Sequence, residues 1–421
     1  MHIANKEYTL TEFYDSTKVF LEVRDESHLM PHEIAFLSLS DLKDFGCFES
    51  WTCYGTNNQL SYASHGVFRY FGKFPPPIAT HLIRKYTSDR QMVVDLMSGS
   101  GTTGVEALIE HRNCILNDIN PLSELLAIVK TTHIPKEHLL ETRQHFINHF
   151  RQITFDEYPF LPTGLKNYEH WFLPETVDSL RGIKYLIQQE SSPEIKNFLN
   201  VCLAATIRRV SRATSQQGRL FLDVESAVKD AFPFFLKRFD IGVNGVTSIP
   251  SRDDLTINST RYDLKIPLPD YLKEIADLII LHPPYFNAYK YSSVNSLELS
   301  WLGFDHNQIR KSEVREFFKV GKEENSQKYV DDMVQVMKNS ASALKTGGRL
   351  ALMIGDTIIH GNYIPITKML LNAIGSEIFD VELIALRTPK YTEASWAASQ
   401  RRNSEKVGIT LYDYIVVMRK K

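Results

Sequence analysis

A histidine, two prolines and a tyrosine follow an apolar run in the stretch "ADLIILHPPYFN", and together they could act on an amino group. Consecutive prolines donate no ladder hydrogen bonds and fix φ near −65°, so Pro283 and Pro284 should end a strand and stiffen the backbone after it. A rigid Pro283 carbonyl beside a neutral His282 ring provides two acceptors for one amine. Tyr285 and Phe286 offer ring faces on which a flat base could stack. The plain alternative is a proline turn that only ends a strand.

A second candidate site is the glycine loop in "VVDLMSGSGTTGVEA", which follows Asp95 and precedes a helical pattern. Glycines such as Gly99 and Gly101 are needed where φ is positive or where a ligand lies against the backbone. No lysine follows them, so the phosphate loop of nucleotide hydrolases is missing its cation, and the strict dinucleotide glycine pattern is absent. Asp118 ends the next expected strand, where a carboxylate can accept from both ribose hydroxyls. The pattern favours an adenosine ligand without a diphosphate, although such loops also occur with no ligand.

The elements around these sites predict an α/β fold. Strand, glycine loop, helix, strand and helix alternate between about residues 91 and 130, which is typical of a βαβ unit in a Rossmann-like, doubly wound sheet. Helical periodicity then dominates to about 245, and strands resume at about 254 and end in an expected antiparallel pair. We therefore expect an N-terminal extension (1–65), a cofactor half (66–134), a helical insertion (135–250) and a catalytic half with a C-terminal hairpin (251–421).

Composition sets further bounds. The 421 residues carry a formal net charge of −2, and 43% of them are hydrophobic, which suits a globular protein whose basic residues act only where they cluster. The four cysteines show neither CxxC spacing nor histidine partners, so we expect no metal site. No signal peptide or apolar run long enough to span a bilayer is evident, which predicts a cytoplasmic protein without a membrane partner.

The motifs together resemble those of amino-group DNA methyltransferases, which methylate N4 of cytosine or N6 of adenine. In that family the glycine loop often reads Ser-Gly-Ser-Gly-Thr-Thr, as at 98–103 here, and the catalytic loop is Asp, Asn or Ser followed by Pro-Pro and an aromatic residue. "FGKFPP" (71–76) resembles the family's motif for the methionine end of the cofactor, and "NDINPLSELLAIVKT" (117–131) resembles the segment after its glycine loop. His282 is a departure from the family pattern and gives an HPPY variant.

The resemblance implies a class I methyltransferase fold and S-adenosyl-L-methionine as the cofactor. It implies a site-specific enzyme that acts on a base flipped out of double-stranded DNA, and we expect N4 of cytosine slightly ahead of N6 of adenine. The catalytic residues are then His282, Pro283, Pro284 and Tyr285. The cofactor-binding residues are Lys73, Phe74, Pro75, Asp95, Met97, Ser98, Gly99, Ser100, Gly101, Thr102, Thr103, Asp118, Ile119 and Asn120.

Two basic clusters are candidates for contacts to nucleic acid, because arginines near aromatic rings suit phosphates and unstacked bases. One ends a helix of the insertion and the other lies in a late loop around Tyr391 and Trp396; solvated basic segments are the alternative for both. The predicted DNA-binding residues are Arg208, Arg209 and Arg212, with Arg219 nearby, and Arg387, Lys390, Arg401 and Arg402. Either the helical insertion or the N-terminal extension would read the DNA sequence; an insertion with a purely structural role is the alternative.

Two other functions remain open on the sequence. A strand ending in Pro-Pro-Tyr also suits methylation of an RNA amine or a protein glutamine, and loss of turnover through His282 would leave a non-catalytic module that binds cofactor and DNA. A monomer or a dimer, and a cognate restriction nuclease or another defence-system component as partner, are expectations of the family only. Because a protonated imidazole cannot accept, we expect methyl transfer to fall below about pH 6.5 and His282→Asn to flatten that fall.

Overall fold

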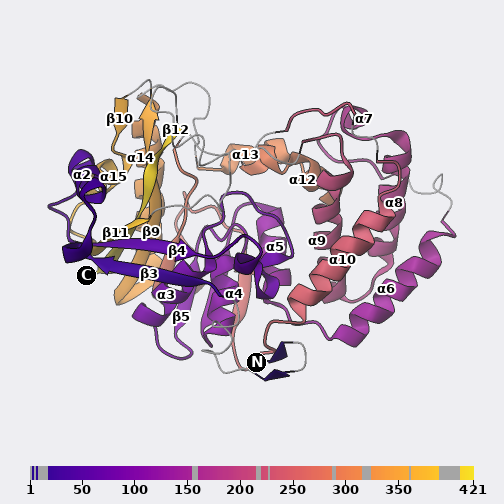
Figure 1. Ribbon diagram of the computed structural model, residues 1–421, viewed down its shortest axis with the longest axis horizontal. Coiled ribbons are helices and arrows are strands. Elements are labelled where there is room, and N and C mark those ends of the chain that lie inside the picture. Colours follow the sequence, from indigo (N-terminus) through magenta and orange to yellow (C-terminus); the bar gives the residue numbers. More distant parts are fainter. Residues whose placement is uncertain are drawn as a thin grey trace.

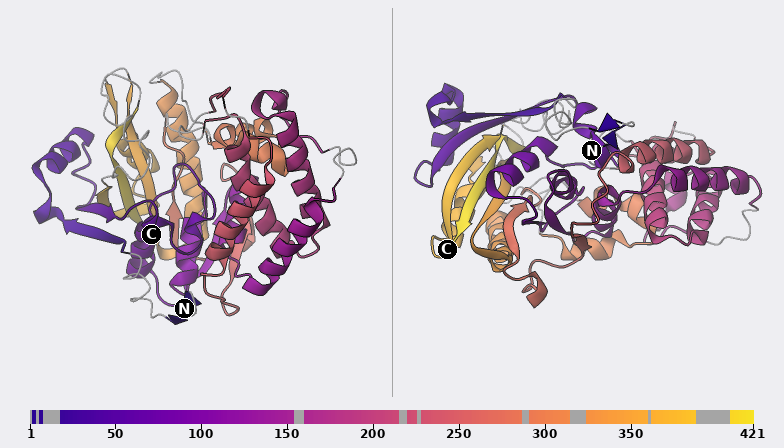
Figure 2. Two further views of the ribbon diagram at one scale, coloured as in Figure 1. Left: turned by 45° about the vertical axis from the view of Figure 1, so that its right-hand side comes forward. Right: turned by 90° about the horizontal axis from the view of Figure 1, so that it is seen from below.

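The computed structural model describes residues 2–3, 6–7, 18–153, 160–214, 220–225, 228–286, 291–314, 324–359, 362–387 and 408–421. In these ranges one 10-stranded sheet runs in the order β3-β4-β11-β12-β9-β8-β5-β6-β7, with β10 paired to β9. A separate two-stranded pair, β1 (His2–Ile3) and β2 (Lys6–Glu7), precedes it. The large sheet and a body of helices lie side by side (Figures 1 and 2).

The part of the sheet from β7 at its edge to β9 is parallel. Its strands are β5 (Met92–Asp95), β6 (Asn113–Asn117), β7 (Ile257–Thr260), β8 (Ala276–Leu281) and β9 (Leu344–Ile359). Beyond β9 lies β12 (Gly408–Lys420), which is antiparallel to both β9 and β11 (Phe379–Arg387), so the expected final antiparallel pair is present. The order β7-β6-β5-β8-β9-β12-β11 with one antiparallel strand confirms the predicted Rossmann-like class I methyltransferase sheet.

Helices cover both faces of this sheet. Successive residues of a strand point to opposite sides, so neighbouring residues pack against different helices. Val93 and Leu278 pack in a core cluster with helix α3 (Pro76–Tyr86), whereas Val94 and Ile279 face α14 (Glu324–Ala343) and α15 (Ile366–Ile374). α4 (Thr102–Ile109) and α5 (Pro121–Thr131) follow β5 and β6. The predicted doubly wound arrangement is thus observed. The short β10 (Asn362–Ile364) turns back on β9.

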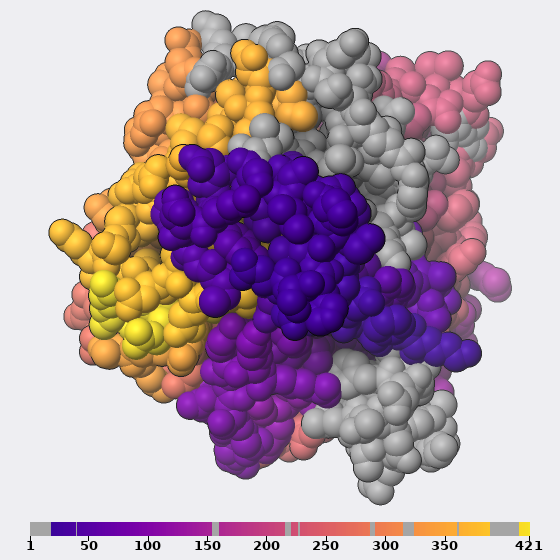
Figure 3. Space-filling model, turned by 60° about the vertical axis from the view of Figure 1, so that its left-hand side comes forward, coloured from indigo at the N-terminus to yellow at the C-terminus, as the bar shows by residue number. Residues whose placement is uncertain are grey.

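The N-terminal extension, for which the sequence predicted no shape, enlarges the same sheet. β4 (Cys47–Tyr54) pairs in parallel with β11, and β3 (Phe20–Asp25) pairs antiparallel with β4. Trp51 of β4 is fully buried against α3. Between the strands lie η1 (Glu26–His28) and α2 (Pro31–Ser40), and η2 (Gln59–Ser61) and η3 (Ala63–Gly66) follow. Figure 3 shows this indigo segment packed beside the yellow C-terminal strands.

The helical body is built mainly from the predicted insertion. Its helices are α6 (Lys136–Phe150), α7 (Tyr168–Trp171), α8 (Pro174–Gln189), α9 (Pro193–Val210) and α10 (Phe232–Val246), and several begin with proline, as the sequence suggested. One later helix joins it: α12 (Ser296–Leu302) buries Leu297 and Trp301 in the same apolar cluster. The segment after the HPPY loop, with α11 (Tyr291–Val294) and α13 (His306–Ser312), therefore connects the sheet to the helical body. η5 (Asp270–Leu272) precedes β8. Among the described helices, none is long and apolar enough to cross a bilayer.

Candidate active site

The glycine loop between β5 and α4 adopts a conformation that only glycine tolerates well. Gly99 and Gly101 have φ of +48° and +74°. A Cβ on Gly101 would lie 3.0 Å from the Ala127 Cα atom, and a Cβ on Gly99 would lie 3.3 Å from the Tyr70 ring. The loop therefore packs directly on α5 and on one wall of a cavity. On the α5 side of the loop, the Nζ atom of the fully buried Lys130 donates to the Ser100 carbonyl at 2.8 Å.

Asp95 holds this loop together. Its carboxylate accepts from the Met97 amide at 3.1 Å and from the Thr103 hydroxyl at 2.5 Å. The side chain is only 1% exposed, and burial raises its pKa to about 7. Asp95, Gly101 and Thr103, which the sequence assigned to cofactor binding, do not line the cavity and shape the loop from within.

Asp118 stands directly after β6 at the cavity edge. Its carboxylate accepts from the Gly99 amide at 2.8 Å and from the Asn120 amide at 2.9 Å, so it joins the two loops that end β5 and β6. Burial raises the pKa of Asp118 to about 6, these backbone hydrogen bonds oppose that rise, and the nearby Glu313 charge adds to it. Asn120 in turn caps α5 by accepting from the Leu122 amide at 3.0 Å.

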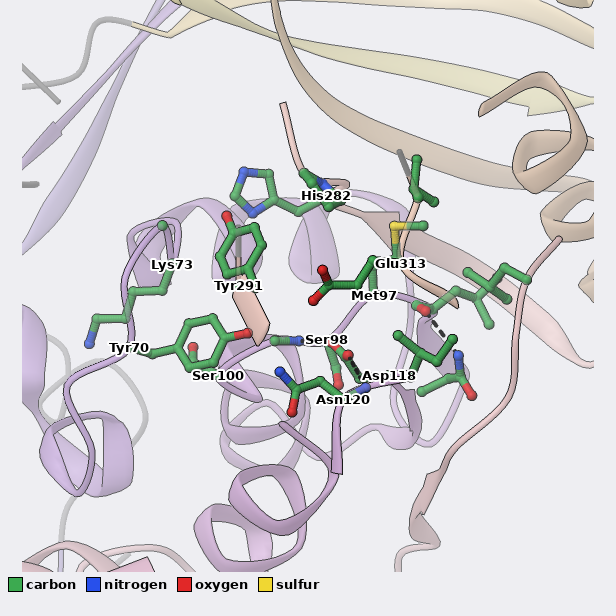
Figure 4. A pocket seen from close by; sticks show the side chains of 18 of the residues that line it. Tyr70, Lys73, Met97, Ser98, Ser100, Asp118, Asn120, His282, Tyr291 and Glu313 are labelled. Carbon is green, nitrogen blue, oxygen red and sulfur yellow. Dashed lines mark hydrogen bonds between the residues drawn. The ribbon is translucent and has the colours of Figure 1, made fainter. Parts of the chain in front are cut away.

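The glycine loop and the histidine-proline loop meet in one cavity of about 880 Å³, part of which is open to solvent (Figure 4). The sequence-predicted residues in its lining are Lys73, Phe74, Met97, Ser98, Gly99, Ser100, Thr102, Asp118, Ile119, Asn120, His282 and Pro284. Sequence reasoning missed the other lining residues, which are Tyr70, Gly72, Leu96, Asn117, Tyr262, Asp263, Leu264, Tyr291, Ser312, Glu313 and Val314.

His282 sits between two aromatic rings at the top of this cavity. Its ring meets Phe74 and Tyr285 edge-on, with centroids 5.4 Å and 5.3 Å away, and its Nε2 atom is 3.3 Å from the Tyr285 hydroxyl. Burial lowers the pKa of His282 to about 4, the Arg387 charge lowers it further, and Asp413 opposes them. The expectation of a titration near pH 6.5 is therefore wrong, because this imidazole stays neutral well below that pH.

The rest of the HPPY loop is packed more tightly than the sequence suggested. Pro283 is buried, and the Pro284 carbonyl accepts from the Tyr329 hydroxyl at 2.7 Å. Tyr285 is 8% exposed and lies against Gly355, where a Cβ would come within 2.9 Å of its ring. Phe286 is fully buried beside Tyr329 in the core. The stacking role predicted for Phe286 is therefore wrong, and neither Pro283 nor Tyr285 lines the cavity.

Two other tyrosines present their rings to the cavity. Tyr70 and Tyr291 are stacked with centroids 6.0 Å apart and an interplanar angle of 15°. The Tyr70 hydroxyl and the Ser123 hydroxyl lie 3.1 Å apart, which fixes one end of the pair on α5. The sequence held one signal for Tyr70, because it directly precedes "FGKFPP"; Tyr291 had none.

Glu313 brings a second carboxylate into the cavity. It accepts from the Ser292 amide at 2.9 Å and from the Ser292 hydroxyl at 3.0 Å, and burial raises its pKa. Figure 4 shows its carboxyl group on the same side of the cavity as Asp118, whereas the Lys73 amine points away. Lys73 donates to the His65 carbonyl at 3.2 Å, and burial lowers its pKa to about 8. The predicted Pro75 lines a neighbouring cavity.

The predicted DNA-binding residues divide into three groups. Arg208 and Arg209 lie in the last turn of α9 and line the neighbouring cavity, whereas the Arg212 backbone amide donates to the Trp171 carbonyl at 2.7 Å. We expected Arg387 to contact phosphate from an exposed loop. It is only 6% exposed and is paired with the buried Asp413, close to His282. Arg219, Lys390, Tyr391, Trp396, Arg401 and Arg402 lie outside the described residues.

The groups that line the cavity fit an adenosine. A carboxylate after the second strand suits two ribose hydroxyls, the glycine loop lets a ligand approach the backbone, and Met97 and Ile119 offer apolar surface beside them. Among the described residues, no cluster of histidines, cysteines and carboxylates suited to a metal ion is found.

Comparison with known proteins adds a family and several relatives. Residues 3–127 match the family described as DNA methylase (N6_N4_Mtase). Type II methyltransferase M.MvaI of Kocuria varians is 22% identical over 308 residues, covering 68% of this chain and 68% of the relative. Type II methyltransferase M.BsoBI of Geobacillus stearothermophilus is 22% identical over 287 residues, covering 59% of this chain and 54% of the relative. Of that second relative the alignment spans only about half.

Solved structures are more distant. TrmN from Thermus thermophilus is 12% identical with a TM-score of 0.32, over 83% of this chain and 50% of that chain. The methylase match implies S-adenosyl-L-methionine as the cofactor, and the lining of the cavity fits its adenosine part.

Proposed function

We propose, from the DNA methylase match and the geometry of the cavity, that this chain is an amino-group DNA methyltransferase. It would methylate the exocyclic amine of a base flipped out of double-stranded DNA, with N4 of cytosine slightly favoured over N6 of adenine. The observation that carries the proposal is that Ser98, Gly99 and Asp118 line the same cavity as His282 and Pro284. A cofactor and a base amine could meet there without rearrangement of the sheet.

His282 is proposed to accept a hydrogen bond from the base amine. An exocyclic amine is a poor nucleophile because its lone pair is delocalised into the ring, and an acceptor helps most as positive charge grows on nitrogen. A pKa of about 4 keeps the imidazole neutral, so one ring nitrogen can accept a hydrogen bond at physiological pH. When bound, S-adenosyl-L-methionine supplies the methyl group.

The Pro283 carbonyl is the second proposed acceptor. Pro283 is buried and the next carbonyl is fixed by Tyr329, so the backbone after β8 is held in one conformation. Holding reactants in place lowers the barrier because little freedom is left to lose.

The stacked pair Tyr70 and Tyr291 is the proposed platform for a flat ring, in place of Phe286. Base stacking on an aromatic side chain contributes roughly 1–3 kcal/mol. A tyrosine whose hydroxyl is already fixed, as Tyr70 is by Ser123, loses little freedom when a ring stacks on it. Tyr291 is the other ring of this proposed platform for the base. Its replacement by alanine should weaken nucleic-acid binding more than cofactor binding.

The partners remain part of the proposal. Double-stranded DNA is the proposed substrate, recognised by the helical body or by the N-terminal extension, and a restriction nuclease or another defence component is the proposed companion. The relatives are named as type II methyltransferases, which supports a role in restriction-modification. The protein is proposed to act as a monomer or a dimer in the cytoplasm.

A labelled-cofactor experiment tests the proposed function. The purified chain is incubated with S-adenosyl-L-methionine carrying a labelled methyl group and, separately, with genomic DNA, total RNA or a protein extract. Label in DNA is the expected result, and label only in RNA or protein identifies one of the two other amino methyltransferases. Calorimetric binding of the cofactor with label in none of them identifies a non-catalytic module.

A further inference from the structure

A second cavity lies between the helical body and the loop that precedes α3. It contains about 1460 Å³ of space, part of it open to solvent. Residues of α9, α10 and α12 form one wall, and residues between 57 and 76 form the other. Tyr70, Gly72, Lys73 and Phe74 line both this cavity and the cofactor cavity, so the two are separated only by that short segment.

Four arginines converge on this second cavity from both walls. Arg208 and Arg209 come from the last turn of α9, Arg238 comes from α10, and Arg69 comes from the facing loop. They lie close enough to repel one another. Burial lowers the pKa of Arg69, and the charges of Arg209 and Arg208 lower it further. Burial also lowers the pKa of Arg238, and the Arg209 charge adds to this effect. We call Arg69, Arg208, Arg209 and Arg238 the arginine pocket.

The described residues compensate little of the positive charge of the arginine pocket. Glu298 is the one acidic residue in its described lining, and its carboxylate is engaged by the Arg208 Nη2 atom at 3.2 Å. Arg208 is 9% exposed, yet its Nε and Nη1 atoms have no hydrogen-bond partner among the described residues. Within the same described ranges, no carboxylate pairs with Arg69, Arg209 or Arg238. Arg69 and Arg209 are exposed and Arg238 is half-buried, so only the unsatisfied donors of the buried Arg208 are costly unless a ligand supplies negative charge.

Phosphate is the anion that this arrangement suits. Guanidinium groups donate two parallel hydrogen bonds to phosphate oxygens, and several of them can surround one group. Arg69 lies over the Phe71 ring with its Cζ atom 5.2 Å from the centroid, which holds one guanidinium in place by a cation–π contact. A lone carboxylate would satisfy fewer of the donors gathered here.

We propose that the arginine pocket binds a backbone phosphate of the strand that carries the target base, beside the nucleotide in the cofactor cavity. This inference rests on the proposed function and adds Arg69 and Arg238 to the substrate-binding residues. It also gives Arg208 and Arg209 a specific place, a partly open cavity in which they face Arg69 and Arg238. The Tyr70–Phe74 segment would then lie between a bound phosphate and its nucleoside.

The test compares DNA binding of the wild type and of a double variant, Arg69→Gln with Arg238→Gln, by fluorescence anisotropy on a mixed-sequence duplex over a range of salt. Both positions leave the Arg208–Glu298 pair intact. Loss of one phosphate contact should weaken binding roughly tenfold and reduce the slope of log affinity against log salt by about one unit. Lys237→Gln is the matched control, because Lys237 is exposed on α10 and does not line the pocket.

Two further measurements separate the outcomes. Affinity for S-adenosylhomocysteine and the melting temperature should stay at wild-type values in the double variant, which excludes a general defect. A double variant with the affinity and salt slope of the wild type overturns the proposal.

Titration with inorganic pyrophosphate distinguishes a DNA phosphate from a free anion as the ligand. If the variant loses pyrophosphate binding while its DNA binding is unchanged, the pocket binds a free anion. If the wild type neither binds nor methylates DNA, the proposed function fails, and the pyrophosphate titration alone decides whether the pocket takes anions.

Discussion

The Nε2 atom of His282 lies 3.3 Å from the Tyr285 hydroxyl, three residues later in the same loop. One nitrogen of the ring is thereby oriented from within the loop, and the ring as a whole is held edge-on between Phe74 and Tyr285. Burial and the Arg387 charge keep this ring neutral by lowering its pKa to about 4. The loop thus presents a ring whose charge state does not change near neutral pH, and the tautomer protonated at Nε2 leaves Nδ1 as a hydrogen-bond acceptor.

The turnover number at saturating cofactor and DNA should therefore be independent of pH between 8 and 5. His282 binds its proton only near pH 4, and a protonated ring could not accept. In His282→Ala, which has no side-chain acceptor, the turnover number should fall by roughly 100-fold or more, because a positioned acid or base contributes typically about that much, and it should remain flat. A tenfold fall of the wild-type value by pH 5 would remove His282 from the proposed role.

Cofactor affinity should depend on pH in a range above the pKa of His282, because Asp118 titrates there. Its pKa of about 6 means that the carboxylate is ionised above pH 6 and protonated below it. A ligand whose hydroxyls donate to the ionised form lowers this pKa further, so affinity is complete above pH 6 and falls by up to tenfold per unit below it. Calorimetry with S-adenosylhomocysteine from pH 5 to 8 measures the effect. Asp118→Asn should weaken binding and abolish the dependence, and an Asp118→Asn variant with the same acid limb as the wild type would contradict this role.

Replacement of Gly101 should reveal how closely the glycine loop packs on α5. Gly101→Ala carries two costs, a φ of +74° and a Cβ that would lie 3.0 Å from the Ala127 Cα atom. Gly347→Ala has a similar φ of +76° but nothing within 4 Å of its Cβ, so it reports the backbone cost alone, about 1 kcal/mol. We expect urea unfolding to show a larger loss for Gly101→Ala, by roughly 1–3 kcal/mol. Equal losses in the two variants would show that α5 yields to the new methyl group.

Breaking the Arg387–Asp413 pair should affect both stability and His282. Both side chains are buried, and Arg387→Met would leave Asp413 charged without this partner, at a cost of roughly 3–5 kcal/mol. Because the Arg387 charge lowers the pKa of His282, its removal should raise that pKa. Urea unfolding checks the first effect, and histidine titration by NMR checks the second. The combination of Arg387→Met with Asp413→Leu should restore most of the stability; a double variant as unstable as the single one would contradict the pairing.

The sequence predicted those parts of the fold and site that depend on local pattern. Gly99, Gly101 and Asp118 were found because a loop between strand and helix needs positive φ and because ligands bind where parallel strands end. The sheet followed from the alternation of strands and helices. The order of loops along the sheet then placed His282 beside the glycine loop.

Other parts depend on contacts between distant residues. Glu313 and Tyr291 reach the cavity from the segment after the HPPY loop, where no motif marks them. Phe286 looked available for stacking, but the helix α14 covers it, and no local pattern reveals burial by a helix about 40 residues later. Arg387 appeared to belong to a basic loop, whereas it is the last residue of β11 and its partner Asp413 comes from the adjacent strand. The low pKa of His282 likewise follows from burial rather than from residue type.

Nucleoside analysis of DNA tests the central claim most directly. DNA from cells that express the wild type or His282→Ala is digested to nucleosides and analysed by mass spectrometry. One cavity shared by the cofactor and a base amine predicts N4-methylcytosine in the wild-type sample, with N6-methyladenine as the other amine product, and neither in the variant. Methylation at C5 of cytosine, no methylated base in the wild-type sample, or equal methylation in both samples would contradict it.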